Sequence, residues 1–163
     1  FTSSKHPVYS FNRLLENTYA KLIELDTSIQ AAKPSSRVQN LNSLRNGCEN
    51  ITVYSAAKTL EYEMVLSNVD QNRTKLKDNF LIAYLASIDS DSVEKVITYT
   101  KTFANDVMTE EERRRTAILL WKILPSKAEF AQDFSIYLLE NLEKAKLSFK
   151  IPQYIQDGLN FLK

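Results

Sequence analysis

The sequence predicts an all-α fold, either a single compact irregular bundle of about seven helices or a short helical-hairpin array. Three observations predict it. The chain contains only two glycines, Gly47 and Gly158, whereas tight β-hairpin turns and many phosphate-binding loops depend on glycine to reach positive φ. Apolar residues recur at steps of three and four along most of the chain, as on one face of an α-helix. Four Ser, Thr or Asp residues each stand three residues before Glu or Gln, which is the form of a helix capping box.

The N-terminal elements are an irregular lead-in and a long helix. Residues 1–9, which include Pro7, predict the lead-in, and Pro34 ends a helix expected over about residues 10–32. The helix carries an apolar stripe at helical spacing, formed by Phe11, Leu14, Leu15, Tyr19, Leu22, Ile23 and Leu25.

Two helices are expected next. Ser36 and Gln39 have capping-box spacing, and Gly47 stands where a left-handed C-terminal cap belongs, so a short helix lies between them. A longer helix is expected over about residues 49–69. Its beginning, with the letters ITVY, is rich in strand-favouring residues, but the helical periodicity continues for four further turns and favours a helix.

The middle of the chain predicts two more helices. Asp70 opens the first, which continues to about Ile88. Asp91 and Glu94 have capping form at the start of the second, which is expected to end near Met108. Residues 70–108 and 109–150 each contain a helix, a break and a helix, and this period near 40 is the basis of the helical-hairpin alternative.

The letters TEEERRR begin the next helix. Thr109 and Glu112 form a capping box, and the pairs Glu110–Arg114 and Glu111–Arg115 have the favoured i,i+4 orientation. These pairs explain the charge cluster as the solvated first turn of a helix. Residues 117–124 are apolar except for Lys122, so the helix is expected at the centre of the fold or in contact with another chain.

The C-terminal part predicts two helices. Ser126 and Glu129 form a capping box at the start of a helix over about residues 127–147. Pro152 suits the first turn of a last short helix, which is expected to dock on the body. Because no low-complexity segment or linker interrupts residues 1–163, a single all-helical domain is predicted.

The composition excludes several kinds of chemistry. Cys48 and His6 are the only cysteine and histidine, so one chain cannot form a structural zinc site or a disulfide, and no metal, cofactor or catalytic group is predicted. Glycine-rich nucleotide loops are absent. The most apolar run, residues 117–124, is far shorter than a membrane span. The single cysteine favours a reducing intracellular compartment, the cytoplasm or nucleus. Because the sequence begins with Phe1, the chain is expected to be either a fragment or a processed product. Removal of a presequence would place it in an organelle.

The sequence therefore predicts a non-catalytic helical interaction domain that binds other proteins within a larger assembly, as an adaptor or scaffold. The alternative is an RNA- or DNA-binding module with a local basic face, although 21 basic against 20 acidic residues give no overall basic charge. A small-ligand carrier or an enzyme is the weakest alternative, because it needs a buried polar pocket that the sequence does not show. Tyr99 and Tyr137 are candidates for base stacking in that module. The candidate partner or nucleic-acid contacts are Arg113, Arg114, Arg115, Trp121, Lys144, Lys146 and Lys150.

Overall fold

The computed structural model describes residues 9–163, and 68% of these residues are helical, with no β-strand among them. The lead-in predicted for residues 1–9 lies outside the described residues, apart from Tyr9. The described part contains ten α-helices and two 3-10 helices, more than the seven predicted, because several predicted helices are interrupted. In chain order they are α1 (Phe11–Leu14), η1 (Asn17–Tyr19), α2 (Ala20–Gln30), α3 (Ser36–Arg45), α4 (Leu60–Asn68), η2 (Arg73–Asp78), α5 (Phe80–Ile88), α6 (Ser90–Thr100), α7 (Glu110–Trp121), α8 (Lys127–Glu140), α9 (Leu142–Ser148) and α10 (Gln153–Phe161).

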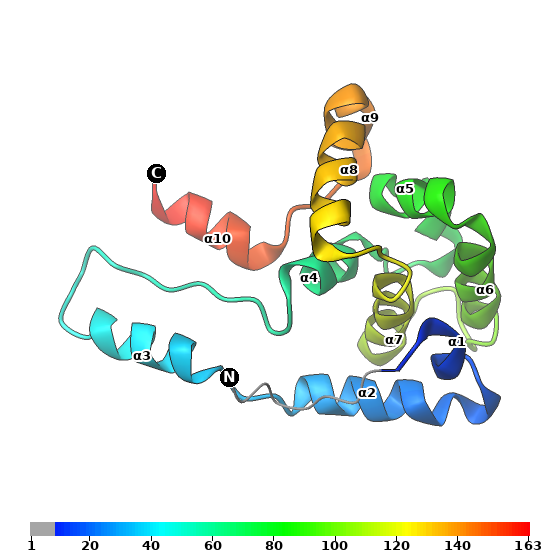
Figure 1. Cartoon of the computed structure of the whole chain (residues 1–163), viewed down its shortest axis with the longest axis horizontal. Coiled ribbons are helices and arrows are strands. Elements are labelled where there is room, and N and C mark those ends of the chain that lie inside the picture. Colours follow the sequence, from blue (N-terminus) through cyan, green and yellow to red (C-terminus); the bar gives the residue numbers. More distant parts are fainter. Residues whose placement is uncertain (1–8) are drawn as a thin grey trace.

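Helix α7 is the central element, as its apolar sequence predicts. It packs against α2, α4 and α6, while α5 packs against α4, α6 and α9 (Figure 1). The five consecutive residues Thr116, Ala117, Ile118, Leu119 and Leu120 are all buried. Since α7 packs against α2 and α4, which precede the 70–108 pair, as well as against its sequence neighbour α6, the packing is that of a compact irregular bundle.

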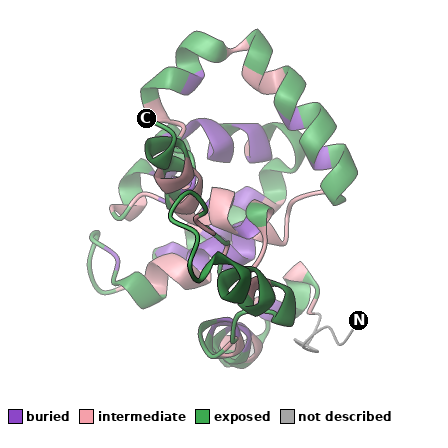
Figure 2. Ribbon diagram, turned by 90° about the vertical axis from the view of Figure 1, so that its left-hand side faces the viewer, coloured by how far each residue is buried: buried purple, intermediate pink, exposed green. Residues whose placement is uncertain are grey.

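Two helices lie outside this bundle. Neither α3 nor α10 contains a buried residue, and Figure 1 shows α3 with the following extended segment reaching away from the other helices. Figure 2 shows the buried residues gathered in the middle of the molecule, with exposed residues covering the peripheral helices. The last helix is therefore docked on the body less closely than the sequence predicts.

The helix predicted over residues 10–32 is broken. Thr18 and Tyr19 have φ of 63° and 53°, a left-handed conformation that ends η1 and redirects the chain into α2. This conformation costs free energy for residues with a Cβ atom. The Tyr19 ring packs edge-on against Tyr99, with ring centroids 4.7 Å apart, and Leu14 and Leu22 on either side of the break are fully buried. Burial of both apolar flanks favours the break over a straight helix.

The helix predicted over residues 49–69 begins only at Leu60. Residues 51–56 have no helical structure, so the β-branched residues that favour extended backbone there outweigh the apolar periodicity. The true cap is Thr59, whose hydroxyl oxygen accepts a hydrogen bond from the Tyr62 amide at 3.3 Å.

Other predicted boundaries shift for similar local reasons. Asp70 does not open an α-helix; it is followed by η2, and α5 begins after Asn79, whose side chain caps it. Asp89 caps α6 instead of Asp91, and the helix ends at Thr100, well before Met108. Ser35 caps α3 in place of Ser36. The predicted helix over 127–147 is divided at Asn141 into α8 and α9.

Three predicted signals are confirmed. Thr109 and Glu112 form a complete capping box at the start of α7. The Ser126 hydroxyl oxygen accepts a hydrogen bond from the Glu129 amide at the start of α8. Gly47 follows α3 with φ of 90°, a conformation that favours glycine.

A buried pair of asparagines joins the C-terminal part to the bundle. The Asn68 amide donates to the Lys150 carbonyl and its oxygen accepts from the Lys150 amide, both at 2.8 Å. Asn79 donates to Asn68 at 3.0 Å and to the Ser148 carbonyl at 2.9 Å. These contacts hold the segment between α9 and α10 in place, and Pro152 beside it is buried.

Candidate interaction surfaces

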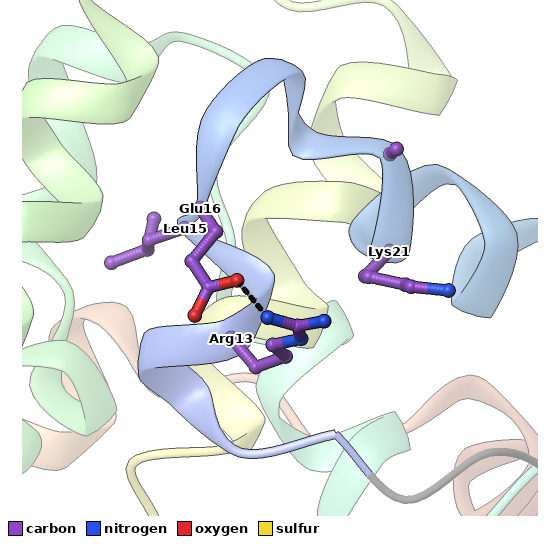
Figure 3. A pocket seen from close by; sticks show the side chains of 5 residues that line it. Arg13, Leu15, Glu16 and Lys21 are labelled. Atoms are coloured by element: carbon purple, nitrogen blue, oxygen red, sulfur yellow. Dashed lines mark hydrogen bonds and ion pairs between the residues drawn. The ribbon is translucent and has the colours of Figure 1, made fainter.

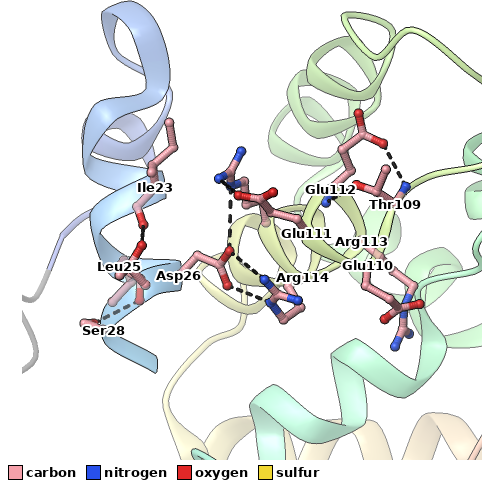
Figure 4. Close-up of polar contacts among 12 residues, drawn as sticks. Ile23, Leu25, Asp26, Ser28, Thr109, Glu110, Glu111, Glu112, Arg113 and Arg114 are labelled. Atoms are coloured by element: carbon pink, nitrogen blue, oxygen red, sulfur yellow. Dashed lines mark hydrogen bonds and ion pairs between the residues drawn. The ribbon is translucent and has the colours of Figure 1, made fainter. Parts of the chain in front are cut away.

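The three consecutive arginines of α7 all contact other parts of the chain, and Figure 4 shows Arg114 directed at Asp26. Arg114 donates two hydrogen bonds to the Asp26 carboxylate, at 3.0 and 3.3 Å. Arg115 lies 3.7 Å from the same carboxylate and also pairs with Glu111. Asp26 is a buried residue of α2, with a side chain only 4% exposed. Two arginines of α7 therefore compensate the buried carboxylate of α2.

Arg113 has a different intramolecular role. Its guanidinium donates to the carbonyl oxygens of Leu66 at 2.7 Å and Val69 at 3.4 Å, which belong to the C-terminal end of α4. It also pairs with Glu110 at 3.2 Å. A cation at the C-terminal end of a helix satisfies carbonyl groups that have no partner within the helix. The predicted role of the arginines in binding a partner stays a prediction, and their geometry favours a structural role.

The sequence predicted the local pairs of α7 better than the distant one. The Glu111–Arg115 pair forms. The Glu110–Arg114 pair does not, because Arg114 is engaged by Asp26 and Glu110 pairs with Arg113. The interpretation of the cluster as a solvated first turn is thus correct for the acidic residues and wrong for the arginines, whose side chains are only 20–25% exposed.

The lysines of the C-terminal part do not join the arginines. Lys144, Lys146 and Lys150 are exposed, and Lys146 pairs with Glu143 at 2.7 Å. Figure 1 shows α9, which carries Lys144 and Lys146, at the top of the view, far from the arginine-bearing start of α7. These two lysines and the arginines therefore form no common basic face, whereas the backbone of Lys150 is bonded to Asn68 at the end of α4.

The tyrosines predicted to stack on bases are occupied by other rings. Tyr99 is buried between Tyr19 and Phe103, and this burial raises its pKa to about 12. Tyr137 packs against Phe80 and Tyr84 at centroid distances of 5.0 and 5.2 Å. Both therefore contribute to the core.

Trp121 lies at a surface corner where α7 ends and α8 begins. Its indole packs edge-on against Tyr62 at 5.7 Å, and the Lys122 ammonium lies 4.5 Å from the ring centroid, which is a cation–π geometry. A hollow of about 200 Å³ opens beside the ring. We call this hollow the Trp121 corner, and it is lined by Glu61, Trp121, Lys122, Leu124, Pro125 and Lys127.

A second surface, the α10 groove, lies between α10 and the extended segment before α4. Its volume is about 410 Å³. Leu159 and Leu162 are 52% and 80% exposed, and Ile51 on the opposite wall is 51% exposed. The groove is lined by Asn50, Ile51, Thr52, Tyr54, Ile155, Gly158, Leu159, Phe161 and Leu162.

The α10 groove is not predicted by the sequence. The sequence predicts that the apolar residues of the last helix dock on the body. In the structure they face residues 50–54, which the sequence predicts to be helical. The sequence contains one signal of this groove. Two successive apolar residues, Phe161 and Leu162, make the apolar face of the last helix wider than a single neighbouring segment can cover.

A third hollow, of about 380 Å³, lies beside α1 and the start of α2 (Figure 3). The charged side chains at its edge, Arg13 and Glu16, pair with each other, and Lys21 pairs with Glu24. Since these charges compensate one another, the hollow offers no group that would select a ligand.

Within residues 9–163, no three His, Cys, Asp or Glu side chains gather as metal ligands would. Cys48 is exposed, and His6, its conceivable catalytic partner, lies outside the described residues. No helix in this part of the chain has the length and apolar character needed to cross a bilayer.

Comparison with protein-family models, with curated proteins and with solved structures finds no match for this chain. The class that the fold and these surfaces define is an all-helical bundle with two peripheral helices.

Proposed function

We propose that this chain is a non-catalytic helical interaction domain that binds protein partners within a larger assembly, as an adaptor or scaffold. The observation that supports the proposal is the α10 groove. Helix α10 is amphipathic, but none of its residues is buried, so its apolar face remains available. Contiguous exposed apolar residues on a folded chain are typical of surfaces that bind another protein.

The partner that fits the α10 groove best is an amphipathic helix. With nine residues, α10 is about 13 Å long, which matches two to three turns of a facing helix that presents apolar residues at positions i, i+3 or i+4, and i+7. The groove lining contains no charged residue, so the binding free energy would come mainly from apolar burial. Burying one leucine side chain contributes about 1.5–3 kcal/mol.

The nucleic-acid alternative has less support from the geometry. Its predicted arginines are paired within the chain, its stacking tyrosines are occupied, and its lysines lie elsewhere. Phosphate binding requires cations that can exchange their counterions for the backbone charge. We therefore keep it as the outcome against which the proposal is tested.

Affinity capture from native extract tests the proposal. The tagged protein is compared with a Leu159→Ser and Leu162→Ser double variant, each with and without nuclease treatment, and retained proteins are identified by mass spectrometry. We expect partners that survive nuclease and are lost from the double variant. Because both leucines are exposed, the double variant should keep the circular dichroism spectrum and unfolding temperature of the wild type.

An Asn160→Ser variant is the control, since Asn160 is also exposed on α10 but does not line the groove. It should capture the same partners as the wild type. Equal capture by the double variant would contradict the assignment of the α10 groove. Loss of every partner after nuclease treatment would instead favour the nucleic-acid alternative.

A further inference from the structure

The Trp121 corner has more positive charge than its own acids compensate. Lys122 and Lys127 line the hollow together with a single acid, Glu61. Lys58 lies beside them, close enough that the charge of Lys122 contributes to lowering its pKa, although burial is the larger cause. The lining residues alone therefore carry two cations and one carboxylate, in a chain whose total charge is only +1.

The lysine that touches the indole has no anionic partner. Among the described residues, neither Lys58 nor Lys122 forms an ion pair, and Lys127 reaches Glu61 only at 3.9 Å. Lys122 is half-buried, and this burial lowers its pKa. The contact with the Trp121 ring compensates only part of the cost of burying this ammonium, because no acid pairs with it in the described part of the chain. An added anionic group would relieve that cost, which gives the corner a preference for such a ligand.

The shape of the corner limits the size of that ligand. About 200 Å³ holds one or two side chains and not a folded element. Leu124, Pro125 and the indole of Trp121 supply apolar contact next to the lysines. The corner therefore fits an acidic side chain that has an apolar neighbour.

We propose that the Trp121 corner binds a carboxylate of a protein partner, held by Lys122 and Lys127 while an adjacent apolar side chain packs on Trp121, Leu124 and Pro125. Phosphate groups of a nucleic acid fit less well. Glu61 lines the hollow and Glu129 follows Lys127 by two residues, so a continuous polyanion would meet acidic side chains on both sides. A single carboxylate meets one acid of the lining, Glu61, in place of a series of acids.

This inference rests on the proposed function only in that the carboxylate belongs to a protein. It concerns a surface separate from the α10 groove, because the two sets of lining residues share no member. An acidic segment would supply charge selectivity that the uncharged α10 groove lacks, since rim charges set partner choice and the rate of association more than affinity.

Trp121 is the only tryptophan of the chain, so its fluorescence reports on this site alone. The emission is followed while the protein is titrated with four probes: an acetylated hexapeptide alternating leucine with aspartate, the same peptide with asparagine, inorganic phosphate, and an oligouridylate. We expect a saturable change with the acidic peptide and a much weaker response to the other three.

Two substitutions locate the contact. Lys122→Gln should weaken binding of the acidic peptide about tenfold, as expected for a partly buried charge-assisted hydrogen bond, and Lys122→Arg should restore most of it. Lys127, with a side chain 75% exposed, should contribute only about two- to fivefold, because exposed ion pairs are weak. Lys144→Gln, which removes one positive charge from an exposed position on α9, is the control and should leave the titration unchanged.

Three results would overturn the proposal: an absent response to the acidic peptide, an equal response to the asparagine peptide, or tighter binding of oligouridylate or phosphate. The outcome is separable from the proposed function. If the peptide fails while nuclease-resistant capture still depends on Leu159 and Leu162, the interaction domain stands and only the assignment of the Trp121 corner is wrong. The Leu159→Ser and Leu162→Ser variant should bind the peptide normally.

Discussion

Replacing Asp26 with asparagine should destabilise the protein more than any exposed charge substitution. The change keeps the size of the side chain but removes the negative charge, leaving Arg114 and Arg115 facing a buried neutral amide. Arg114 donates two charge-assisted hydrogen bonds to Asp26, at 3.0 and 3.3 Å, and the amide can accept only one of them. One hydrogen of the new amide also points toward guanidinium donors, which cannot accept it.

The magnitude follows from the burial of the three partners. Breaking a fully buried pair by removing one partner costs about 3–5 kcal/mol. The arginine side chains here are 25% and 20% exposed, so water compensates part of the loss and the lower end, about 3 kcal/mol, applies. For a chain of this length, each kcal/mol corresponds to about 2–4 °C, so the unfolding midpoint should fall by roughly 6–12 °C.

Thermal and urea unfolding followed by circular dichroism measure this loss. Glu16→Gln is the matched control, because Glu16 forms an ion pair with Arg13 whose two side chains are 54% and 55% exposed, and it should change stability by at most about 0.5 kcal/mol. Equal midpoints for Asp26→Asn and the control would refute the view that α2 and α7 are joined through this carboxylate. The same reasoning predicts that charge reversal of all three arginines unfolds the protein.

Two further predictions concern the asparagine pair and the alkaline limit. Asn68→Leu should cost about 2–4 kcal/mol, because the partly buried Lys150 amide and carbonyl each lose their partner. Limited proteolysis should then cleave near residue 150 first, and resistance there would contradict the assigned role. The pKa of Tyr99 is about 12 in the folded chain against about 10 unfolded, so the unfolded chain ionises first and stability falls between pH 10 and 12. Tyr99→Phe should make the urea midpoint fall less steeply over that pH range, and an unchanged slope would show that Tyr99 ionises equally in both states.

The sequence predicts features of this fold that depend on neighbouring residues. The capping box of Thr109 and Glu112 involves atoms three residues apart, and the structure contains it as predicted. The central position of α7 follows from its apolar residues alone, since a helix that is apolar on most sides must be covered on most sides.

Features set by distant residues could not be predicted in the same way. Arg114 finds Asp26 at a separation of 88 residues, and no local rule ranks that partner above Glu110. The left-handed Thr18 and Tyr19 have no sequence signal, because neither is glycine or asparagine; packing of Tyr19 on Tyr99 favours the turn. The extended backbone of residues 51–56 did have a signal, in its β-branched residues, and the periodicity that outweighed it was misleading.

The candidate surfaces follow the same division. The sequence marks Trp121 because it ends an apolar helix. Its neighbours in the Trp121 corner, Glu61 and Lys58, lie at the start of a helix that the sequence predicts about eleven residues too early. The arginines are candidates on charge alone. In the fold, however, cations beside a buried carboxylate contribute more to stability than they would on the surface. A charged or aromatic residue becomes a candidate for binding only when the fold leaves it without an internal partner. By this criterion the apolar face of α10 qualifies and Arg114 does not, while Lys122 qualifies only in that it contacts the Trp121 ring and no acid.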